Sequence, residues 1–255
     1  MLEQSNSPLA AFDGLTFAPR QDSPIWQQIY NHILGRIESG VLSPGEQLPG
    51  ENHMAARLGV TRVTLRRALQ QLQKEGHLTA RKGVGIFVRS PPAIFSIRDG
   101  RSFRENIDTH SGSISTVTRL LACDQADQTS ARILGVAVGS AIIHLRRVRL
   151  LSEQPIYVND KYFPAHRFPD FDRVYGERQS VSDVFRAHGI DTFRRAETRI
   201  SGGFASPEEA EILQLTPGTP VFRINARNTD GTNDTIEWTR GCWPLTSVEF
   251  VFGPS

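Results

Sequence analysis

Residues 61–75, TRVTLRRALQQLQKE, decide how the first part of this chain folds. Apolar side chains recur there at positions i, i+3, i+4 and i+7, the stripe of an amphipathic helix; they are Leu65, Ala68, Leu69 and Leu72. Thr61 is the predicted N-cap, because its hydroxyl can accept a hydrogen bond from a free amide of the first turn. Gly76 supplies the C-terminal stop. The stretch therefore predicts one well-delimited helix.

The opposite face of this helix is basic. Arg62 and Arg66 are four residues apart and so share a face away from the leucines, flanked by Thr64 and Arg67. The preceding ENHMAARLGV (51–60), with a glycine at its turn, predicts a helix-turn-helix. The second helix of such a pair enters the DNA major groove with its N-terminal residues foremost. An ordinary helix with a solvated basic face fits these residues equally well when they are taken alone.

The flanking residues decide between these interpretations. A helix with isoleucine at every fourth position is predicted to begin at Pro24 and to end at Gly40. The loop VLSPGEQLPGE and a short helix at 51–58 follow. HLTARKGVGIFVRS (77–90) then alternates in polarity around RKGVG, which predicts a β-hairpin with a basic tip. This order of elements is that of a winged helix-turn-helix, which favours the DNA-reading interpretation.

The composition narrows the class of protein. The 255 residues are 38% hydrophobic and 22% charged, a globular composition with enough length for two domains. No run approaches the ~18 apolar residues of a membrane helix, and the N-terminus lacks a signal-peptide pattern. Two cysteines, Cys123 and Cys242, argue against a disulfide framework and fit a reducing cytoplasm. Neither CxxC nor HxxxH is present, so no metal site and no cofactor are predicted.

The net charge of +2 conceals an uneven distribution. Residues 20–90 contain ten Lys or Arg and five Asp or Glu, whereas residues 91–255 contain nineteen and twenty. A compact basic module on a neutral remainder predicts a polyanionic partner for that module alone.

Four segments are predicted along the chain. Residues 1–22 form a flexible tail, 23–89 the winged helix-turn-helix domain, 90–96 a linker that begins Ser-Pro-Pro, and 97–255 a second domain. The second domain alternates strand-like and helix-like stretches, which predicts an α+β fold with an antiparallel sheet. Its predicted elements are strands at 113–124, 193–205 and 247–252, hairpins at 141–164 and 220–244, and helices at 128–136, 180–190 and 206–215.

Two arginines of the first hairpin are candidates for anion binding. Period two places Leu145, Arg147 and Arg149 on one face of the strand, and Arg146 and Val148 on the other. Two guanidinium groups two residues apart can clamp a phosphate or carboxylate through paired donors. A solvated sheet face paired with acids across the hairpin is the alternative.

Enzyme chemistry finds weak support. The sequence has no GxSxG elbow, no HExxH and no cysteine beside a base motif. Asp160 and Glu237 would form a carboxylate pair only if the fold brought them together.

The resemblance of the chain to a known family extends over about residues 24–252. The stretch from PIWQQIYNHIL to the wing GVGIFV resembles, nearly end to end, the winged-helix domain of GntR-superfamily bacterial transcription regulators; PGEQLP, LGVTRVTLRRAL and GVGIFV are specific in combination. The remainder resembles the ligand-sensing UTRA domain of the HutC-type subfamily, a fold related to chorismate lyase. SFRENI, HLRRVR and RRAETRISGGFA look most like the repressors of phosphonate uptake and degradation.

For the first domain the resemblance implies a set of DNA contacts. They comprise the N-terminal end of the second helix of the pair and the tip of the wing: Thr61, Arg62, Thr64, Arg66 and the flanking Arg67, with Lys82 and Gly83. Asn52 stands where many relatives have arginine. An asparagine side chain cannot fork onto guanine as arginine does, so its contact is expected to differ.

For the second domain the resemblance implies an effector site. Sugar-phosphate-sensing relatives hold the phosphate with two strand arginines and a helix-start serine, which match Arg147, Arg149 and Ser180. A carboxylate and an aromatic residue of those relatives match Glu237 and Trp243. Asn159 replaces a further glutamate, and the aromatic is tryptophan where tyrosine is usual. Both differences suit an anion other than a sugar phosphate.

Together these inferences predict a cytoplasmic, homodimeric transcription regulator, specifically a repressor. It would bind double-stranded operator DNA with half-sites on the order of 10 bp apart, and a small phosphonate- or phosphate-like effector. It is not predicted to be an enzyme or to bind a membrane. Two alternatives are a lyase-like enzyme fused to a DNA-targeting module, which needs an acid–base pair in its pocket, and a non-specific architectural DNA-binding protein, which needs no pocket.

Overall fold

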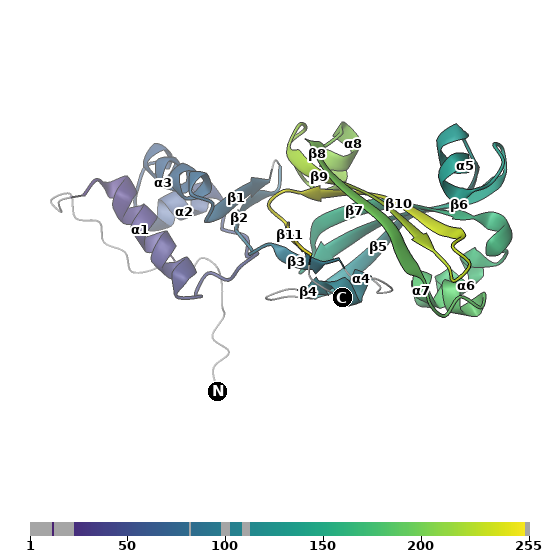
Figure 1. Cartoon of the computed structure of the whole chain (residues 1–255). Helices are drawn as coiled ribbons and strands as arrows, with labels where there is room; N and C mark the ends of the chain where they lie inside the picture. Colours follow the sequence, from purple (N-terminus) through teal and green to yellow (C-terminus); the bar gives the residue numbers. More distant parts are fainter. Residues whose placement is uncertain (1–11, 13–22, 82, 98–102, 109–112, 253–255) are drawn as a thin grey trace. The chain divides into compact units, whose positions relative to one another are not determined.

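The computed structural model describes residues 12, 23–81, 83–97, 103–108 and 113–252 (Figure 1). The chain divides into two compact units, Met1–Pro91 and Pro92–Ser255. No helix in the described part of the chain is long and apolar enough to cross a membrane.

In its described residues from 23 onward, unit 1 contains three α-helices followed by a hairpin, in the predicted order. The helices are α1 (Ile25–Glu38), α2 (Glu51–Leu58) and α3 (Arg62–Lys74). The antiparallel hairpin pairs β1 (Leu78–Arg81) with β2 (Gly85–Val88). The predicted winged helix-turn-helix is therefore confirmed.

The turn between α2 and α3 forms for local reasons. Gly59 adopts a left-handed conformation, with φ of 64°, which costs glycine little because it has no Cβ. The Val60 amide closes the turn on the Ala55 carbonyl at 3.0 Å. The Thr61 hydroxyl then accepts from the Thr64 amide at 3.2 Å, which confirms Thr61 as the N-cap of α3.

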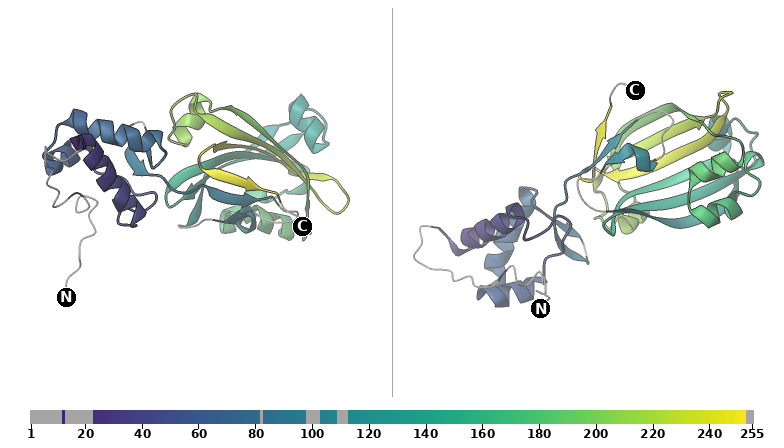
Figure 2. Two further views of the ribbon diagram at one scale, coloured as in Figure 1. Left: turned by 60° about the vertical axis from the view of Figure 1, so that its left-hand side comes forward. Right: turned by 90° about the horizontal axis from the view of Figure 1, so that it is seen from below.

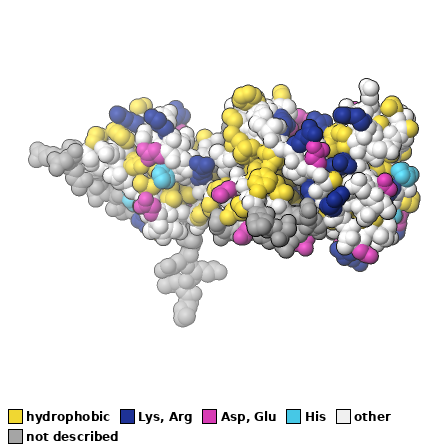
Figure 3. Space-filling view, viewed as in Figure 1, with side chains coloured by type: hydrophobic (Ala, Val, Ile, Leu, Met, Phe, Trp, Pro, Cys, Tyr) yellow, Lys and Arg dark blue, Asp and Glu magenta, His cyan; other side chains and the backbone are white. Residues whose placement is uncertain are grey.

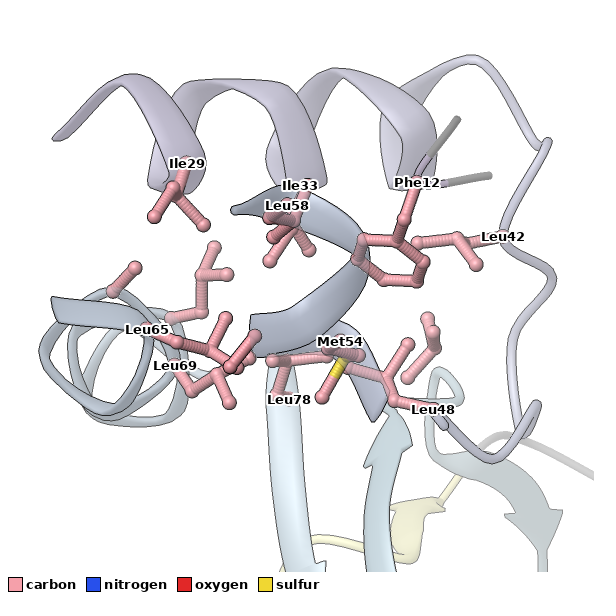
Figure 4. Close-up of a cluster of buried hydrophobic side chains, with 14 residues drawn as sticks. Phe12, Ile29, Ile33, Leu42, Leu48, Met54, Leu58, Leu65, Leu69 and Leu78 are labelled. Carbon is pink, nitrogen blue, oxygen red and sulfur yellow. The ribbon is translucent and has the colours of Figure 1, made fainter. Parts of the chain in front are cut away.

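The core of unit 1 lies where the helices meet the hairpin (Figure 4). The four predicted stripe residues of α3 are all buried, and they pack in one cluster with side chains of α1 and α2: Ile29, Ile33, Met54, Ala55 and Leu58. Phe12 is also buried in this cluster, near Leu42 (Figure 4). Phe12 falls within the predicted tail of residues 1–22, and burial of its apolar ring stabilises its position in this core. The other residues of 1–22 lie outside the described residues.

Unit 2 is built on an antiparallel sheet, as predicted, and this sheet has six strands (Figure 2). Consecutive strands form two hairpins, β6–β7 and β10–β9, which lie side by side in the middle of the sheet because β7 pairs with β10. In spatial order the strands are β5 (Ile114–Gln125), β6 (Ala141–Leu151), β7 (Gln154–Pro164), β10 (Thr235–Pro244), β9 (Pro220–Thr229) and β8 (Arg194–Phe204).

Helices cover both faces of this sheet (Figure 1, Figure 2). On one face, α6 (Phe171–Arg178) and α7 (Val181–Ala187) pack on Leu145 and its neighbours. On the other, α5 (Gln128–Leu134) packs on the Trp238 side of the sheet, and α8 (Pro207–Ile212) packs near Val148 and Cys242. The two sheet faces therefore have separate cores. The helix α6 was not among the elements predicted from sequence.

A small second sheet completes unit 2. Its order is β11 (Val248–Val251), β3 (Ala93–Ser96) and β4 (Ile107–Asp108), with α4 (Phe103–Asn106) before β4. β11 runs parallel to β3, with Phe250 opposite Phe95. The predicted linker over 90–96 therefore needs correction at its C-terminal end. The partner strand lies about 150 residues later in the chain, so the local pattern gave no sign of the pairing.

Candidate functional site

The N-terminal end of α3 presents two arginines that share one carboxylate. Arg66 Nε donates to Glu51 Oε2 at 2.8 Å, and Arg62 Nη2 lies 3.9 Å from the same oxygen. Glu51 is the first residue of α2. Both arginine side chains remain more than half exposed, at 57% and 54%. They are therefore oriented and still accessible to a partner.

The other predicted contacts surround this pair. The hydroxyls of Thr61 and Thr64 lie 2.9 Å apart, while the side chain of Val63 between them is 80% exposed. Asn52 is exposed on the first turn of α2. In the space-filling view, basic side chains gather over α3 (Figure 3).

Two predicted contacts stand apart from this group. Arg67 lies toward α1, with its guanidinium carbon 4.5 Å from the centre of the Trp26 ring, which is a cation–π contact. Gly83 is exposed at the wing with φ of 76°, a conformation that favours glycine. Lys82 lies outside the described residues.

Unit 2 encloses a cavity of about 640 Å³ between the six-stranded sheet, α7 and the small sheet. All six residues predicted for the effector site line this cavity, although they come from three strands, β6, β7 and β10, and from the residue that precedes α7. They are Arg147, Arg149, Asn159, Ser180, Glu237 and Trp243. The fold therefore brings the predicted set together.

The arginine pair forms one wall of the cavity. Arg147 and Arg149 are 3% and 6% exposed, which rules out the alternative of a solvated sheet face. Arg149 Nη1 donates to Thr116, and its guanidinium lies 4.5 Å from the Phe103 ring centre. Arg147 Nε is buried without a hydrogen-bond partner among the described residues. A buried donor of this kind calls for an acceptor from a ligand or water.

The neighbouring Arg146, unlike Arg147 and Arg149, is not among the residues that line the cavity. Its side chain lies on the other face, where Nε donates to Asp160 Oδ1 at 2.7 Å and Nη1 to Glu208. The predicted division of the strand into two faces is thus confirmed. Asp160 and Glu237 also lie on opposite faces of the sheet, so they do not form the carboxylate pair that an acid–base enzyme would need.

Lys161 is a cavity residue that the sequence reasoning missed. Its Nζ donates to Glu237 Oε1 and, at 3.1 Å, to Thr239. Burial lowers the pKa of its ammonium group to about 7; the nearby Glu237 opposes this shift, while Arg147 and Arg195 add to it. The sequence pattern could have indicated Lys161 as a cavity residue. Period two puts it on the same face as Asn159, which pairs with Arg147 across the hairpin.

Glu237 is held by a network of donors. Its Oε1 accepts from Lys161, from Thr239 at 2.7 Å and from Asn228 Nδ2 at 3.3 Å. Burial favours the neutral acid, but Lys161, Thr239 and Arg195 outweigh burial and lower the pKa of the Glu237 carboxyl. Glu237 is therefore an ionised carboxylate with one oxygen already engaged.

The cavity has an excess of positive charge. Of the described residues that line it, six are Arg or Lys and three are Asp or Glu. Among them, Arg195 of β8 pairs with Asn228 on β9, and this pairing between strands is not visible in the sequence. A cavity with this balance favours an anionic ligand.

Aromatic rings also line the cavity, next to Arg149, whose guanidinium lies over the Phe103 ring. Trp243 is fully buried and stacks on Tyr157, with ring centres 4.2 Å apart, and Tyr157 stacks on Phe103 at 5.7 Å. Gly241 permits this arrangement, because a Cβ there would lie 2.2 Å from the Tyr157 hydroxyl. The site thus combines charged and aromatic side chains in its lining, which is typical of small-molecule pockets.

Ser180 is the N-cap residue of α7. Its hydroxyl accepts from the Asp183 amide at 3.2 Å, so it caps the helix while lining the cavity. In the described residues no cluster of three or more His, Cys, Asp or Glu side chains could hold a metal ion.

A winged helix-turn-helix followed by an α+β domain with a cavity defines the class of two-domain transcription regulators. Comparison with known proteins agrees. Residues 25–88 match the gntR family of bacterial regulatory proteins, and residues 113–249 match the UTRA domain. The chain therefore belongs to the GntR family, as a regulator with a UTRA domain. Regulators of this family bind operator DNA and act as dimers.

Sequence relatives support this assignment. The chain is 31% identical over 217 residues to the HTH-type transcriptional regulator RB1450 of Rhizobium meliloti, covering 85% of this chain and 89% of that protein. It is 31% identical over 203 residues to the HTH-type transcriptional repressor NagR of Bacillus subtilis, covering 79% and 82%. Because such relatives are regulators, the enzyme alternative is set aside.

Solved structures share the fold. PhnF from Mycobacterium smegmatis matches with a TM-score of 0.61 and 24% identity, over 89% of this chain and 99% of that one. YydK from Bacillus subtilis matches with a TM-score of 0.54 and 18% identity, over 91% and 100%.

Proposed function

We propose that this regulator is a cytoplasmic repressor that binds its operator as a homodimer and senses a small phosphate- or phosphonate-like anion. The observation that carries the effector class is the buried, unpartnered Arg147 Nε in a cavity with excess positive charge. An anion supplies the missing acceptor and offsets the charge at the same time.

The DNA-reading role is proposed for the N-terminal end of α3. Arg62 and Arg66 are accessible, and an arginine fork on guanine is the commonest specific base contact. Thr61 and Thr64 are placed beside them, and the exposed Val63 suits an apolar contact with a thymine methyl group. Asn52, Lys82 and Gly83 are proposed as flanking contacts, with Arg67 supporting the helix through Trp26.

The effector is proposed to bind with its anionic group at Arg147, Arg149 and Ser180. Asn159 faces this wall with a buried Oδ1 that lacks a partner among the described residues, so it can accept a hydrogen bond from the ligand. Glu237 and Trp243 would bound the remainder of the ligand. The resemblance of the sequence to repressors of phosphonate metabolism favours a phosphonate over a sugar phosphate.

The effector is proposed to act by binding one state of the dimer better than the other. A ligand shifts such an equilibrium only through its difference in affinity for the two states. Release of the operator therefore requires tighter effector binding in the state that does not fit both half-sites.

The experiment measures operator release by fluorescence anisotropy with inorganic phosphate and methylphosphonate as probes. Arg147→Ala should leave operator affinity within about twofold and weaken the response to the probe by about tenfold or more, since charge-assisted hydrogen bonds are worth ~1.5–3 kcal/mol. Arg199→Ala is the matched control, because Arg199 is exposed and pairs with Glu197. An equal effector response in the parent chain and the Arg147→Ala variant contradicts the proposal.

A further inference from the structure

The chain uses lysine sparingly. Of its 29 Lys and Arg residues only three are lysines, at positions 74, 82 and 161. Lys161 is the single lysine in the sequence of 92–255, and it lies in the cavity. Arginine cannot be deprotonated in proteins, whereas a buried lysine can lose its proton and become a nucleophile. The cavity therefore offers one amine where the rest of the domain uses guanidinium groups.

The surroundings of Lys161 match those of an activated amine. Its Nζ donates to the Glu237 carboxylate, which is itself oriented by the Thr239 hydroxyl at 2.7 Å and by Asn228 at 3.3 Å. A nucleophile beside a base that is held by a third group is the arrangement found where side chains form covalent bonds. Glu237 is buried, and the Lys161 side chain is only 13% exposed, which restricts competition from bulk water.

Burial and two neighbouring arginines favour the neutral form of the Lys161 amine. Burial lowers the pKa of the Lys161 ammonium to about 7, and the guanidinium groups of Arg147 and Arg195 act in the same direction against the effect of Glu237. A sizeable fraction of the side chain is therefore the neutral amine near neutral pH.

The proposed anion-binding arginines, Arg147 and Arg149, lie at a suitable separation from the Lys161 amine. Arg147 pairs with Asn159 across the hairpin, and Lys161 follows Asn159 by two residues on the same face. The rise per residue of a strand separates the Cα atoms of Asn159 and Lys161 by roughly 7 Å. A ligand anchored by its anionic group at the arginines can thus present a group two or three bonds away to Nζ.

We propose that Lys161 captures a small anion bearing an aldehyde or ketone as a reversible imine. This inference rests on the anion-sensing role proposed above for the same cavity. It narrows the effector to carbonyl compounds that also carry a phosphonate, phosphate or carboxylate group. The capture is stoichiometric and involves no turnover.

Lys161 and Glu237 together supply the proton transfers that imine formation needs. Nζ passes one proton to Glu237, and its lone pair attacks the carbonyl carbon, forming the C–N bond and breaking the C=O π bond. A second Nζ proton moves to the resulting alkoxide. Glu237 returns its proton to the hydroxyl, which leaves as water. The product is a protonated imine that retains the third Nζ proton and remains paired with the Glu237 carboxylate.

The test traps the imine in the full chain by reduction with sodium borohydride. The probe is 2-oxoethylphosphonate, and ethylphosphonate, which lacks the carbonyl, is its matched control. Reduction should leave an adduct with the mass of the probe minus one oxygen, mapped by peptide mass spectrometry to Lys161. Labelling of Lys74 and Lys82 should be at least tenfold lower. Excess ethylphosphonate should protect Lys161 and leave the labelling of Lys74 unchanged.

The variant Lys161→Arg keeps the positive charge and removes the nucleophile. It should still gain thermal stability from ethylphosphonate while losing the adduct. No adduct at Lys161, or labelling equal to that of Lys74, overturns the imine. If ethylphosphonate stabilises the parent chain but not Arg147→Ala, and the adduct is absent, the imine fails while the anion site stands. If Lys161 is labelled equally in Arg147→Ala, the imine stands and the role of Arg147 fails.

Discussion

Replacing Glu51 by glutamine should reduce discrimination between operator and random DNA without unfolding unit 1. Glu51 accepts from Arg66 at 2.8 Å and lies 3.9 Å from Arg62, and both arginines are more than half exposed. Exposed pairs of this kind contribute about 0.2–1 kcal/mol, and an acid in the first turn of a helix a similar amount. The loss of stability should therefore be on the order of 1 kcal/mol.

The effect on DNA binding has two opposing parts. Removing a negative charge beside phosphates should raise affinity for random duplex, by up to about tenfold at low salt. Freeing the two arginines from their shared carboxylate should weaken base contacts, and each bidentate contact to guanine is worth ~1–3 kcal/mol of discrimination. The ratio of operator to random affinity should therefore fall by roughly tenfold or more.

Fluorescence anisotropy with labelled operator and a scrambled duplex, at one stated salt concentration, measures this ratio directly. Glu38→Gln is the matched control, because it makes the same charge change in the last turn of α1. Equal gains in affinity for operator and scrambled DNA in Glu51→Gln would show that Glu51 only repels phosphates and does not orient the arginines.

Two further substitutions test the stability of unit 2. Asp230 accepts from the amides of Thr232 and Asp234, each at 3.0 Å, and from Arg167 at 2.6 Å; burial opposes ionisation, but these donors outweigh it and lower the pKa of the Asp230 carboxyl to about 2. A lowered folded pKa adds stability above the unfolded value near 4, which is lost as the pH falls through about 2, so Asp230→Asn should cost about 1–2 kcal/mol at pH 7. Urea unfolding of both chains should show the difference shrinking toward pH 2, and a constant difference contradicts the linkage. Gly241→Ala should lower the free energy of unfolding by about 1–3 kcal/mol, because the new Cβ would lie 2.2 Å from the Tyr157 hydroxyl. Gly202→Ala, with nothing within 4 Å, should be close to neutral, and equal effects of the two changes refute the packing argument.

Local patterns predicted most of the architecture. The stripe of α3, its Thr61 cap and the two hairpins of unit 2 all follow from spacing and turn residues, and all are present. The two faces of β6 follow from period two alone, and they correctly separated Arg147 from Arg146.

What could not be predicted depends on contacts that are distant in sequence. β3 is a strand because it pairs with β11 and β4, and Phe12 is buried in a cluster whose other members lie between residues 29 and 88. The sequence also did not place Lys161 against Glu237, since that contact requires β7 to pair with β10. The fold brings together the six cavity residues that the family resemblance implies. Lys161, which also lines the cavity, was not predicted.

The most direct measurement of the central claim compares the affinity of the full chain for DNA from its own upstream region with that for a scrambled duplex, at the same salt. A regulator reading bases through Arg62 and Arg66 should prefer the upstream DNA by roughly 10³-fold or more. Arg62→Ala should lose most of that preference while retaining the circular dichroism spectrum of the parent. Equal affinity of the parent chain for both duplexes would contradict the account and favour a non-specific DNA-binding protein.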